Sequence, residues 1–409
     1  MEKIKLYGKF EAAETYVMRE FLHKSVIDFD WIEVRSADAE GLPRLGNHHS
    51  AIQFPDGTVV LNPTIEEVAR RLGWITKPSA KEYDLSIYGA GPAGLSAAVY
   101  AASEGLRTIL VEREAIGGQA GTSSLIENYM GFPKGISGSE LAERARQQAA
   151  KFGVEILLLQ EGIRGHFHNG NIHVDLADGG KLIARSNICA TGVEYASLGI
   201  PNEEFFFNKG VYYGAGAGEA CFCNGMDVYV VGGGNSAGQA ASYFSGFADN
   251  VYLIVRRNNL AETLSDYLVK RIRDIPNIHV LYNSEVRELE GDDSLRRIRI
   301  YNSQTGDSQW RETGKLFICI GGKPNTDWAA ETKIIRDING YLVTGGDLLQ
   351  RKEFSGKWDL DRLPYHLETS VAGCFAAGDV RLNSVKRVAS AVGEGAMAVT
   401  MVHKYLSQL

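Results

Sequence analysis

The sequence predicts an α/β protein with two three-layer dinucleotide-binding domains of the Rossmann type, and two glycine-rich turns carry that prediction. The first turn spans Gly89–Gly94 and the second spans Gly232–Ala237. Each turn follows a short apolar strand and opens a helix, after which a second strand follows. The residues before Asp84 have their own alternation of strands and helices, so we expect a separate small domain in front.

The composition limits the classes of function. The chain has 409 residues, with 44% hydrophobic and 23% charged side chains, which is typical of a soluble globular protein of two or three domains. Its net charge of -7 shows no basic excess, so no nucleic-acid partner is expected. Residues 1–10 lack the apolar core of a signal peptide, and no apolar run could cross a bilayer, so we expect a cytoplasmic protein without a membrane partner. The five cysteines do not indicate a disulfide framework in such a chain.

The order of elements in residues 1–76 can be read from apolar patterns and turn signals. Strands are expected at 3–7, 29–34, 51–54 and 58–61, and helices at 14–23 and 64–72. This order resembles a glutaredoxin-like thioredoxin fold, in which a cysteine pair would follow the first strand. The loop there, Gly8–Ala13, has no cysteine, and the proline that such a fold expects is missing at about His49 or Ser50. Because a thiol relay needs a thiolate, we expect a docking, dimerising or regulatory module, followed by a linker at 77–82.

The first glycine-rich turn has a mechanical reason for each glycine. Gly89 permits the tight turn, Gly91 lets the backbone approach a pyrophosphate, and Gly94 allows the helix to pack closely on the strand. The helix N-terminus offers free N–H groups to the phosphates. Glu112 ends the next strand, where a carboxylate can accept hydrogen bonds from ribose hydroxyls. The predicted dinucleotide-binding residues of this unit are Gly89, Gly91, Pro92, Ala93, Gly94 and Glu112.

Further motifs follow this unit, namely GGQ at 117–119, IENY at 126–129, ATG at 190–192 and GIP at 199–201. With them, residues 83–409 resemble the low-molecular-weight thioredoxin reductases, which have the fold of the pyridine nucleotide-disulfide oxidoreductases. The resemblance implies a discontinuous FAD-binding domain at 83–200 and 323–409, and an NAD(P)-binding domain at 201–322. It also implies FAD-binding roles for Gly117, Gly118, Gln119, Asn128, Thr191 and Gly192.

The resemblance extends to the C-terminal part of the chain. GGKPNT at 321–326 marks the return crossover, and an apolar strand from Cys374 ends at Gly378 and Asp379. By resemblance Asp379 receives the ribityl hydroxyls of the flavin, which suits a carboxylate because it accepts without needing to donate. The next helix begins with Lys386, Arg387 and Val388, where the family has Arg-Gln against the flavin. Such a cation would change the electrostatics near the ring.

The second glycine-rich turn predicts a second nucleotide site. The predicted residues are Gly232, Gly234, Asn235, Ser236, Ala237, Arg256 and Arg257. The acid of the first unit is replaced here by Arg256-Arg257, which favours a 2′-phosphate and therefore NADPH over NADH. A solvated basic pair at a strand end is the plainer alternative. The resembling reductases have a third arginine at the position of Ala261, so a second flavin in this pocket also stays open.

The redox cysteine pair of the resembling reductases has no counterpart in the sequence. The corresponding stretch is Gly214-Ala215-Gly216-Ala217. Cys221 and Cys223 follow, but residues two apart face away from each other on a helix and lie near the upper bridging limit on a strand. The histidines of GHFHNGNIH at 165–173 lack a third ligand, so no metal site is expected.

These patterns predict an FAD-dependent pyridine nucleotide oxidoreductase that passes electrons from NADPH to an acceptor protein or small molecule that the sequence does not identify. No catalytic side chain can be named, because the cofactor itself carries the chemistry. The resemblance implies a homodimer. Two alternatives stay open: a nicotinamide-independent flavoenzyme that is ferredoxin-linked or contains two flavins, and a flavin-binding sensor or scaffold without enzymatic activity.

Overall fold

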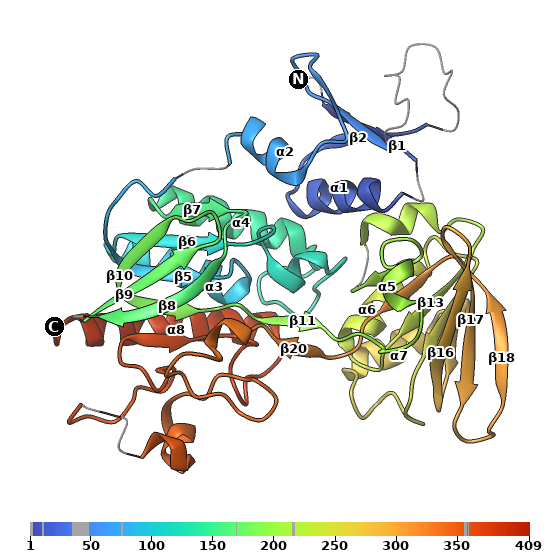
Figure 1. The fold of residues 1–409 in the computed structure, drawn as a ribbon. Coiled ribbons are helices and arrows are strands. Elements are labelled where there is room, and N and C mark those ends of the chain that lie inside the picture. Colours follow the sequence, from blue (N-terminus) through green and yellow to red (C-terminus); the bar gives the residue numbers. More distant parts are fainter. Residues whose placement is uncertain are drawn as a thin grey trace. The chain divides into compact units, whose positions relative to one another are not determined.

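Figure 1 shows a computed structural model of the chain, which describes residues 3–9, 12–34, 49–74, 77–168, 170–214, 217–355, 358 and 360–409. Its internal contacts divide the chain into two compact units. Unit 1 contains Met1–Val68, Thr122–Ile126 and Tyr195–Gly321; unit 2 contains Ala69–Gly121, Glu127–Glu194 and Gly322–Leu409. The glycine-rich turn at Gly89 therefore lies in unit 2 and the turn at Gly232 in unit 1.

Unit 2 is built on one mixed sheet with the strand order β7-β6-β5-β10-β9-β8, and a further strand, β21, pairs with β10. The strands are β5 (Tyr83–Tyr88), β6 (Thr108–Glu112), β7 (Glu155–Leu158), β8 (Gly162–His168), β9 (Asn171–Leu176), β10 (Lys181–Cys189) and β21 (Cys374–Ala376). The pairs among β5, β6, β7, β10 and β21 are parallel, whereas β8–β9 and β9–β10 are antiparallel. The strands predicted at 84–88 and 108–111 are confirmed. They could be predicted because parallel strands that are buried on both faces have nearly continuous apolar sequences.

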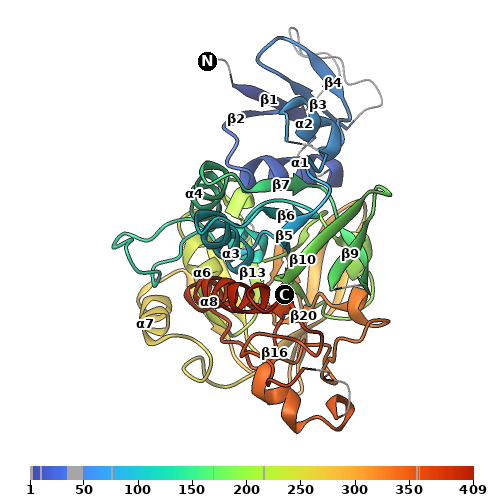
Figure 2. The same ribbon diagram turned by 90° about the vertical axis from the view of Figure 1, so that its left-hand side faces the viewer.

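The α-helices that lie wholly within the described residues of unit 2 are α3 (Pro92–Ser103), α4 (Gly138–Lys151) and α8 (Val388–Leu406). Figure 2 shows α3 and α8 side by side. Gly395 of α8 allows this close approach to α3. A Cβ added at Gly395 would lie 2.1 Å from the Ala93 carbonyl oxygen. Ser96 Oγ donates a hydrogen bond of 2.7 Å to the Val392 carbonyl oxygen and fixes the pair. The helix expected to begin near Lys386 begins at Val388.

Short elements complete this unit and connect it to the rest of the chain. The short helices are η1 (Gly118–Thr122), η3 (Asp327–Ala329), η4 (Gly345–Gln350) and η5 (Lys352–Phe354). At β11 (Val193–Tyr195) and β20 (Gly322–Pro324), which pair with each other, the chain leaves unit 2 and returns to it. The return crossover expected at 321–326 coincides with β20.

Residues 195–321 of unit 1 form a parallel sheet with the order β12-β19-β13-β14-β15 and a second, antiparallel sheet, β16-β17-β18. The parallel strands are β12 (Val211–Tyr213), β13 (Asp227–Val231), β14 (Asn250–Ile254), β15 (Ile278–Leu281) and β19 (Leu316–Ile318). The antiparallel strands are β16 (Ser284–Gly291), β17 (Leu295–Asn302) and β18 (Ser308–Glu312). The helices are α5 (Glu203–Phe206), η2 (Ala217–Phe222), α6 (Asn235–Phe244) and α7 (Asp266–Asp274).

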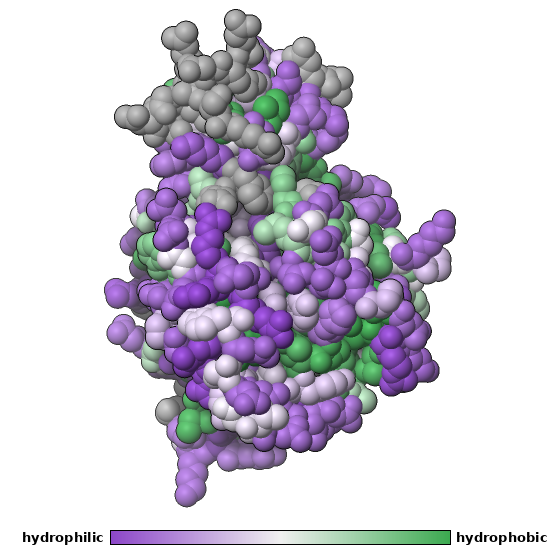
Figure 3. Space-filling model, turned by 90° about the vertical axis from the view of Figure 1, so that its right-hand side faces the viewer, coloured by the Kyte–Doolittle hydropathy of each residue, from purple (hydrophilic) through white to green (hydrophobic). Residues whose placement is uncertain are grey.

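The antiparallel sheet has one buried and one solvated side. Val286 and Ile298 are buried in a core that they share with β13, while Glu290 and Arg297 form an exposed ion pair of 2.6 Å. Most of the surface in view in Figure 3 is hydrophilic, and hydrophobic residues form smaller patches on it.

Residues 3–71 contribute a four-stranded sheet with the order β2-β1-β3-β4. Its elements are β1 (Ile4–Gly8), α1 (Ala13–Lys24), β2 (Phe29–Glu33), β3 (Ser50–Gln53), β4 (Val59–Leu61) and α2 (Ile65–Arg71). Strands β1 and β2 are parallel, and β3 is antiparallel to both β1 and β4. All six elements expected from the sequence are present to within about two residues. None of the helices in the described part of the chain has both the length and the apolar character needed to span a bilayer.

Candidate nucleotide-binding sites

The first glycine-rich turn joins β5 to α3, and two of its glycines are required by the packing of the protein itself. Gly89 has a φ of +101°, and a Cβ there would lie 2.4 Å from the Ala190 carbonyl oxygen. A Cβ at Gly94 would lie 1.8 Å from the Gly89 carbonyl oxygen. A Cβ at Gly91 would meet no protein atom within 4 Å. The open space in front of Gly91, at the N-terminus of α3, therefore fits a pyrophosphate that approaches the backbone closely.

Glu112 ends β6 beside this turn and is 8% exposed. Its carboxylate accepts a hydrogen bond of 2.7 Å from the Ala90 N–H and another of 2.8 Å from the Glu114 N–H. Burial raises the pKa of Glu112, and the two backbone N–H groups oppose that shift. A carboxylate has about four acceptor positions, so capacity for ribose hydroxyls remains after these two bonds.

The GGQ motif lies against the glycine-rich turn. The Gly117 N–H donates a hydrogen bond of 2.8 Å to the Ala90 carbonyl oxygen, and a Cβ at Gly118 would lie 3.2 Å from Gly91 Cα. Gln119 is half-buried at the start of η1, and Asn128 is exposed in the same unit. The structure therefore brings Gly117 and Gly118 to the turn.

The C-terminal residues predicted for FAD approach the same turn. A Cβ at Gly378 would lie 2.9 Å from the Ala93 Cβ, at the start of α3. Partial burial raises the pKa of the adjacent Asp379. Lys386 Nζ donates a hydrogen bond of 2.5 Å to the Asp379 carbonyl oxygen, and the exposed Arg387 is the N-cap of α8. Val388, also predicted, is the first residue of that helix.

The predicted crossover residues make backbone contacts with the returning chain. Thr191 Oγ1 donates a hydrogen bond of 2.8 Å to the Asn325 carbonyl oxygen, and the Asn325 N–H donates one of 3.1 Å to the Gly192 carbonyl oxygen. These bonds fix the end of β10 next to Gly89, since the Ala190 N–H also donates to the Tyr88 carbonyl oxygen.

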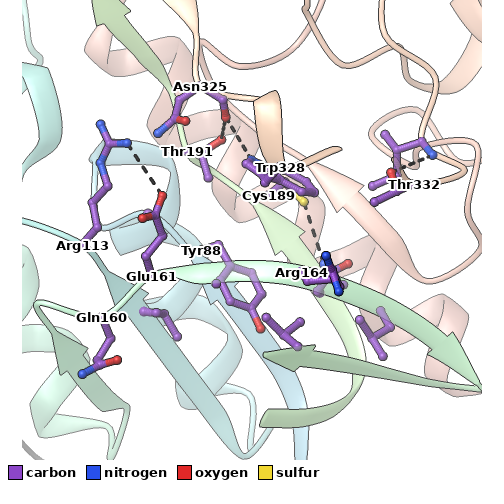
Figure 4. A pocket seen from close by; sticks show the side chains of 18 of the residues that line it. Tyr88, Arg113, Gln160, Glu161, Arg164, Cys189, Thr191, Asn325, Trp328 and Thr332 are labelled. Atoms are coloured by element: carbon purple, nitrogen blue, oxygen red, sulfur yellow. Dashed lines mark hydrogen bonds and ion pairs between the residues drawn. The ribbon is translucent and has the colours of Figure 1, made fainter. Parts of the chain in front are cut away.

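A cavity of about 90 Å³ opens beside Gly89, Glu112 and Thr191 and extends beneath the β8–β9 hairpin (Figure 4). Sequence reasoning did not find its other lining residues, which include Tyr88, Arg113, Gln160, Glu161, Phe167, Asn187, Cys189 and Trp328. Asn187 Oδ1 is buried without a hydrogen-bond partner. Asn187 lies in β10 beside other polar residues such as Arg185 and Ser186, so no local pattern in the sequence indicates this cavity.

Two features of the cavity concern its charges and thiols. Arg113 pairs with Glu194 at 2.5 Å and with Glu161 at 3.9 Å, so this cation, which lines the cavity, is paired. Cys189 Sγ lies 4.0 Å from Cys374 Sγ, and both thiols are buried and free. The contact with Cys374 and burial raise the pKa of Cys189, so its sulfur is a protonated thiol and a poor nucleophile at neutral pH.

The second glycine-rich turn joins β13 to α6 in unit 1. Gly232 has a φ of +147°, and a Cβ there would lie 2.5 Å from the Cys319 carbonyl oxygen. A Cβ at Gly234 would meet no protein atom within 4 Å, which again leaves space in front of a helix N-terminus. Asn235 Nδ2 donates to Ser265 Oγ at 2.9 Å. Ser236 follows in the first turn of α6, and the predicted Ala237 is buried.

The predicted basic pair follows β14 and is exposed. Arg257 forms an ion pair of 2.6 Å with Glu262, a residue that sequence reasoning missed. The signal was available, because Glu262 directly follows Ala261, the position of the absent third arginine. A carboxylate on Arg257 competes with a 2′-phosphate for the same guanidinium group.

The stretch predicted to correspond to the redox cysteine pair is only partly described, since Ala215 and Gly216 lie outside the described residues. Cys223 is buried just after η2, and its Sγ donates a hydrogen bond of 3.3 Å to the Glu219 carbonyl oxygen. The side chains of Cys221 and His168 also lie outside the described residues. In the described part of the chain, no three His, Cys, Asp or Glu side chains gather as a metal site would require.

A family model agrees with this geometry. The model described as pyridine nucleotide-disulphide oxidoreductase matches residues 83–395. A thioredoxin reductase of Peptoclostridium acidaminophilum is 33% identical over 79% of this chain and 97% of its own length. An NADH dehydrogenase of Ferdinandcohnia aciditolerans is 31% identical over 91% of this chain and 67% of its own length. The second alignment extends into the residues before the glycine-rich turn at Gly89.

Solved structures show the same likeness. The structure of Lactococcus lactis thioredoxin reductase matches with a TM-score of 0.71 and 30% identity, covering 80% of this chain and all of that one. The thioredoxin reductase of T. acidophilum matches with a TM-score of 0.70 and 30% identity, covering 80% of this chain and 99% of that one.

Proposed function

Because the chain belongs to the thioredoxin reductase-like group of the pyridine nucleotide-disulphide oxidoreductase family, we propose that it is an FAD-dependent oxidoreductase that passes electrons from NADPH to an acceptor outside its own thiols. The family uses FAD and NADPH and supports both cofactors for this chain. Bound FAD would supply the two-electron chemistry, accepting electrons from the nicotinamide and releasing them to the acceptor.

One observation carries the proposal for FAD. A Cβ at Gly91, the N-cap of α3, would meet no protein atom within 4 Å, and the buried carboxylate of Glu112 accepts a hydrogen bond from the neighbouring Ala90 N–H. The proposed FAD residues are Gly89, Gly91, Pro92, Ala93, Gly94, Glu112, Gly117, Gly118, Gln119, Asn128, Thr191, Gly192, Gly378, Asp379, Lys386, Arg387 and Val388. In unit 1 the matching space in front of Gly234 supports the nicotinamide nucleotide. The proposed residues there are Gly232, Gly234, Asn235, Ser236, Ala237, Arg256 and Arg257.

The acceptor is proposed to react without an internal cysteine pair. The stretch Gly214-Ala215-Gly216-Ala217 has no sulfur, and the described thiols are buried. A disulfide relay needs an accessible thiolate, so electrons would leave the flavin directly to a small molecule or a redox protein.

We also propose that residues 1–76 adopt a glutaredoxin-like thioredoxin fold and are followed by a linker at 77–82. The strand order β2-β1-β3-β4, with one parallel and two antiparallel pairs, supports this proposal. We propose FAD-binding segments at 83–200 and 323–409 and an NAD(P)-binding domain at 201–322. A homodimer and a cytoplasmic location stay predictions, and sedimentation of the purified protein would test the first.

An anaerobic titration of the purified protein tests the function. The proposal expects one FAD per chain and rapid bleaching of the flavin absorbance by NADPH. Two flavins per chain, or bleaching by reduced ferredoxin alone, would favour a nicotinamide-independent flavoenzyme. A flavin that no donor reduces would favour a sensor or scaffold. A colourless protein that does not take up added FAD would contradict all three.

A further inference from the structure

Unit 1 contains a cluster of buried charges that the proposed redox chemistry does not use. Arg19 of α1 lies 2.6 Å from Glu219 Oε1, and Lys315 Nζ lies 2.9 Å from Glu219 Oε2. The side chains are 2–4% exposed. Lys315 Nζ also donates a hydrogen bond of 3.2 Å to Tyr212 Oη. Two cations therefore share one carboxylate, and Glu219 is 200 positions from Arg19 and 96 positions from Lys315 in the sequence.

Aromatic rings enclose this cluster from both segments. The Arg19 guanidinium carbon lies 4.9 Å from the Trp31 ring centre and 4.8 Å from the Phe222 ring centre. Tyr16 of α1 and Tyr212 of β12 have ring centres 4.7 Å apart. Tyr16 is buried in the same hydrophobic core as Tyr212 and residues of α6. The front segment and the second nucleotide-binding region thus share a core as well as a charge cluster.

The free-energy cost of separating α1 from the rest of unit 1 determines whether the front segment can undock. Undocking α1 would expose the buried ring of Tyr16 to water and separate Arg19 from Glu219, which would leave the Glu219–Lys315 pair without its second cation. A tethered module that left and returned in each turnover would have to expose this shared core and break the Arg19–Glu219 pair every time.

We propose that α1 (Ala13–Lys24) is permanently docked on the second nucleotide-binding region through Arg19, and that the surface formed by Tyr212, Glu219, Phe222 and Lys315 is the receptor for α1 of the same chain. The front segment is then a fixed part of unit 1 and not a mobile electron carrier. Its dock includes η2, which begins at Ala217, the last residue of the stretch predicted to correspond to the redox cysteine pair. This inference does not depend on the proposed activity.

Hydrogen–deuterium exchange of the full-length, flavin-loaded protein tests the dock. Amides of α1 (Ala13–Lys24) should be protected to nearly the same degree as those of β13 in the core of unit 1. Glu219→Gln leaves Arg19 and Lys315 facing each other without a carboxylate, so exchange in α1 should accelerate at least about tenfold. Glu290→Gln is the matched control, because it removes an exposed ion pair of the same unit and should leave α1 unchanged.

A second variant keeps the test decisive if Glu219→Gln does not fold. Arg19→Met leaves the Lys315–Glu219 pair intact and keeps most of the apolar contact, so the protein should fold while exchange in α1 rises several-fold. Arg19→Lys should restore only part of the protection, because an ammonium cannot stack on Trp31 and Phe222 as a guanidinium does. The proposal is overturned if α1 of the wild-type protein exchanges as fast as the edge strand β4. It is also overturned if neither Arg19→Met nor Glu219→Gln changes α1 exchange more than the control does.

Discussion

The two glycine-rich turns have the same backbone plan but differ at the last residue of the motif, where the first turn has its third glycine. Gly94 lies where a Cβ would be 1.8 Å from the Gly89 carbonyl oxygen, whereas the second turn has the buried Ala237 at the corresponding position. Helix α3 therefore packs on its turn too closely for any side chain, and α6 leaves room for a methyl group. The same motif thus fixes the position of a helix more strictly in unit 2 than in unit 1.

The two sites also differ in the charged residue that lies at or just after the end of the second strand of each unit, which is β6 in unit 2 and β14 in unit 1. Glu112 is buried and held by two backbone N–H groups, while Arg257 is exposed and held by a side chain, Glu262. A buried group that is fixed by the backbone cannot adapt without cost, but an exposed ion pair can exchange partners. We infer that the first site is built for one permanent cofactor and the second for a nucleotide that binds and leaves.

Gly94→Ala tests the close packing of α3 on the first glycine-rich turn. The added methyl group meets a backbone oxygen that cannot move without moving the turn, so we expect a loss of about 3 kcal/mol or more in stability together with loss of FAD. Thermal unfolding and the flavin absorbance of the purified variant measure both effects. In the second unit Ala237→Gly should cost only about 1–2 kcal/mol, because it lowers helix propensity and removes one buried methyl group without creating a clash.

Gly91→Ala is the matched control for this variant. Its Cβ meets no protein atom, so the protein without FAD should be about as stable as the wild type while its affinity for FAD falls. Equal thermal stability of Gly94→Ala and Gly91→Ala would contradict the packing argument.

Glu112→Gln should lower FAD affinity by about 1–3 kcal/mol, which is roughly fivefold to 150-fold, because an amide offers a donor where the carboxylate accepts bonds from two N–H groups. Burial raises the pKa of Glu112 above its ordinary value of 4.5. The carboxyl group therefore contributes stability to the FAD-free protein below about pH 4.5, and that contribution is lost as the pH rises through the raised pKa. Denaturant unfolding of both proteins across this range measures the difference. A variant with the same pH dependence as the wild type would contradict the assignment.

Arg257→Ala should raise the KM for NADPH by about tenfold, because a hydrogen bond between charged groups contributes about 1.5–3 kcal/mol and Glu262 already offsets part of it. The KM for NADH should change little, since NADH has no 2′-phosphate. Arg287→Ala, which removes an exposed partner of Glu285 in the same unit, is the control. Equal effects on both nucleotides would mean that Arg257 does not contact the 2′-phosphate.

Both turns could be predicted from the sequence, because glycine spacing between a strand and a helix is a local pattern. The apolar strands β5 and β13 and the six elements of the front segment were readable for the same reason. The Arg19–Glu219 pair was not, because its partners are 200 residues apart and a buried arginine on an amphipathic helix looks like any surface arginine. The bond from the Gly378 N–H to Glu394 also depends on how α8 packs, and no local pattern indicates it.

Glu262 differs from these cases, since it lies five residues after Arg257 and its charge could have been counted together with the missing third arginine. The pair is exposed, so Glu262→Gln should improve NADPH binding by only about 0.2–1 kcal/mol, or up to about fivefold in KM. The gain should shrink at high salt, because ions screen an exposed pair, and NADH should be unaffected. Steady-state kinetics with both nucleotides at two ionic strengths measure this. If NADPH binds no better than in the wild type, Glu262 does not compete with the 2′-phosphate for Arg257. The selectivity of the second site would then depend on Arg256 and Arg257 alone.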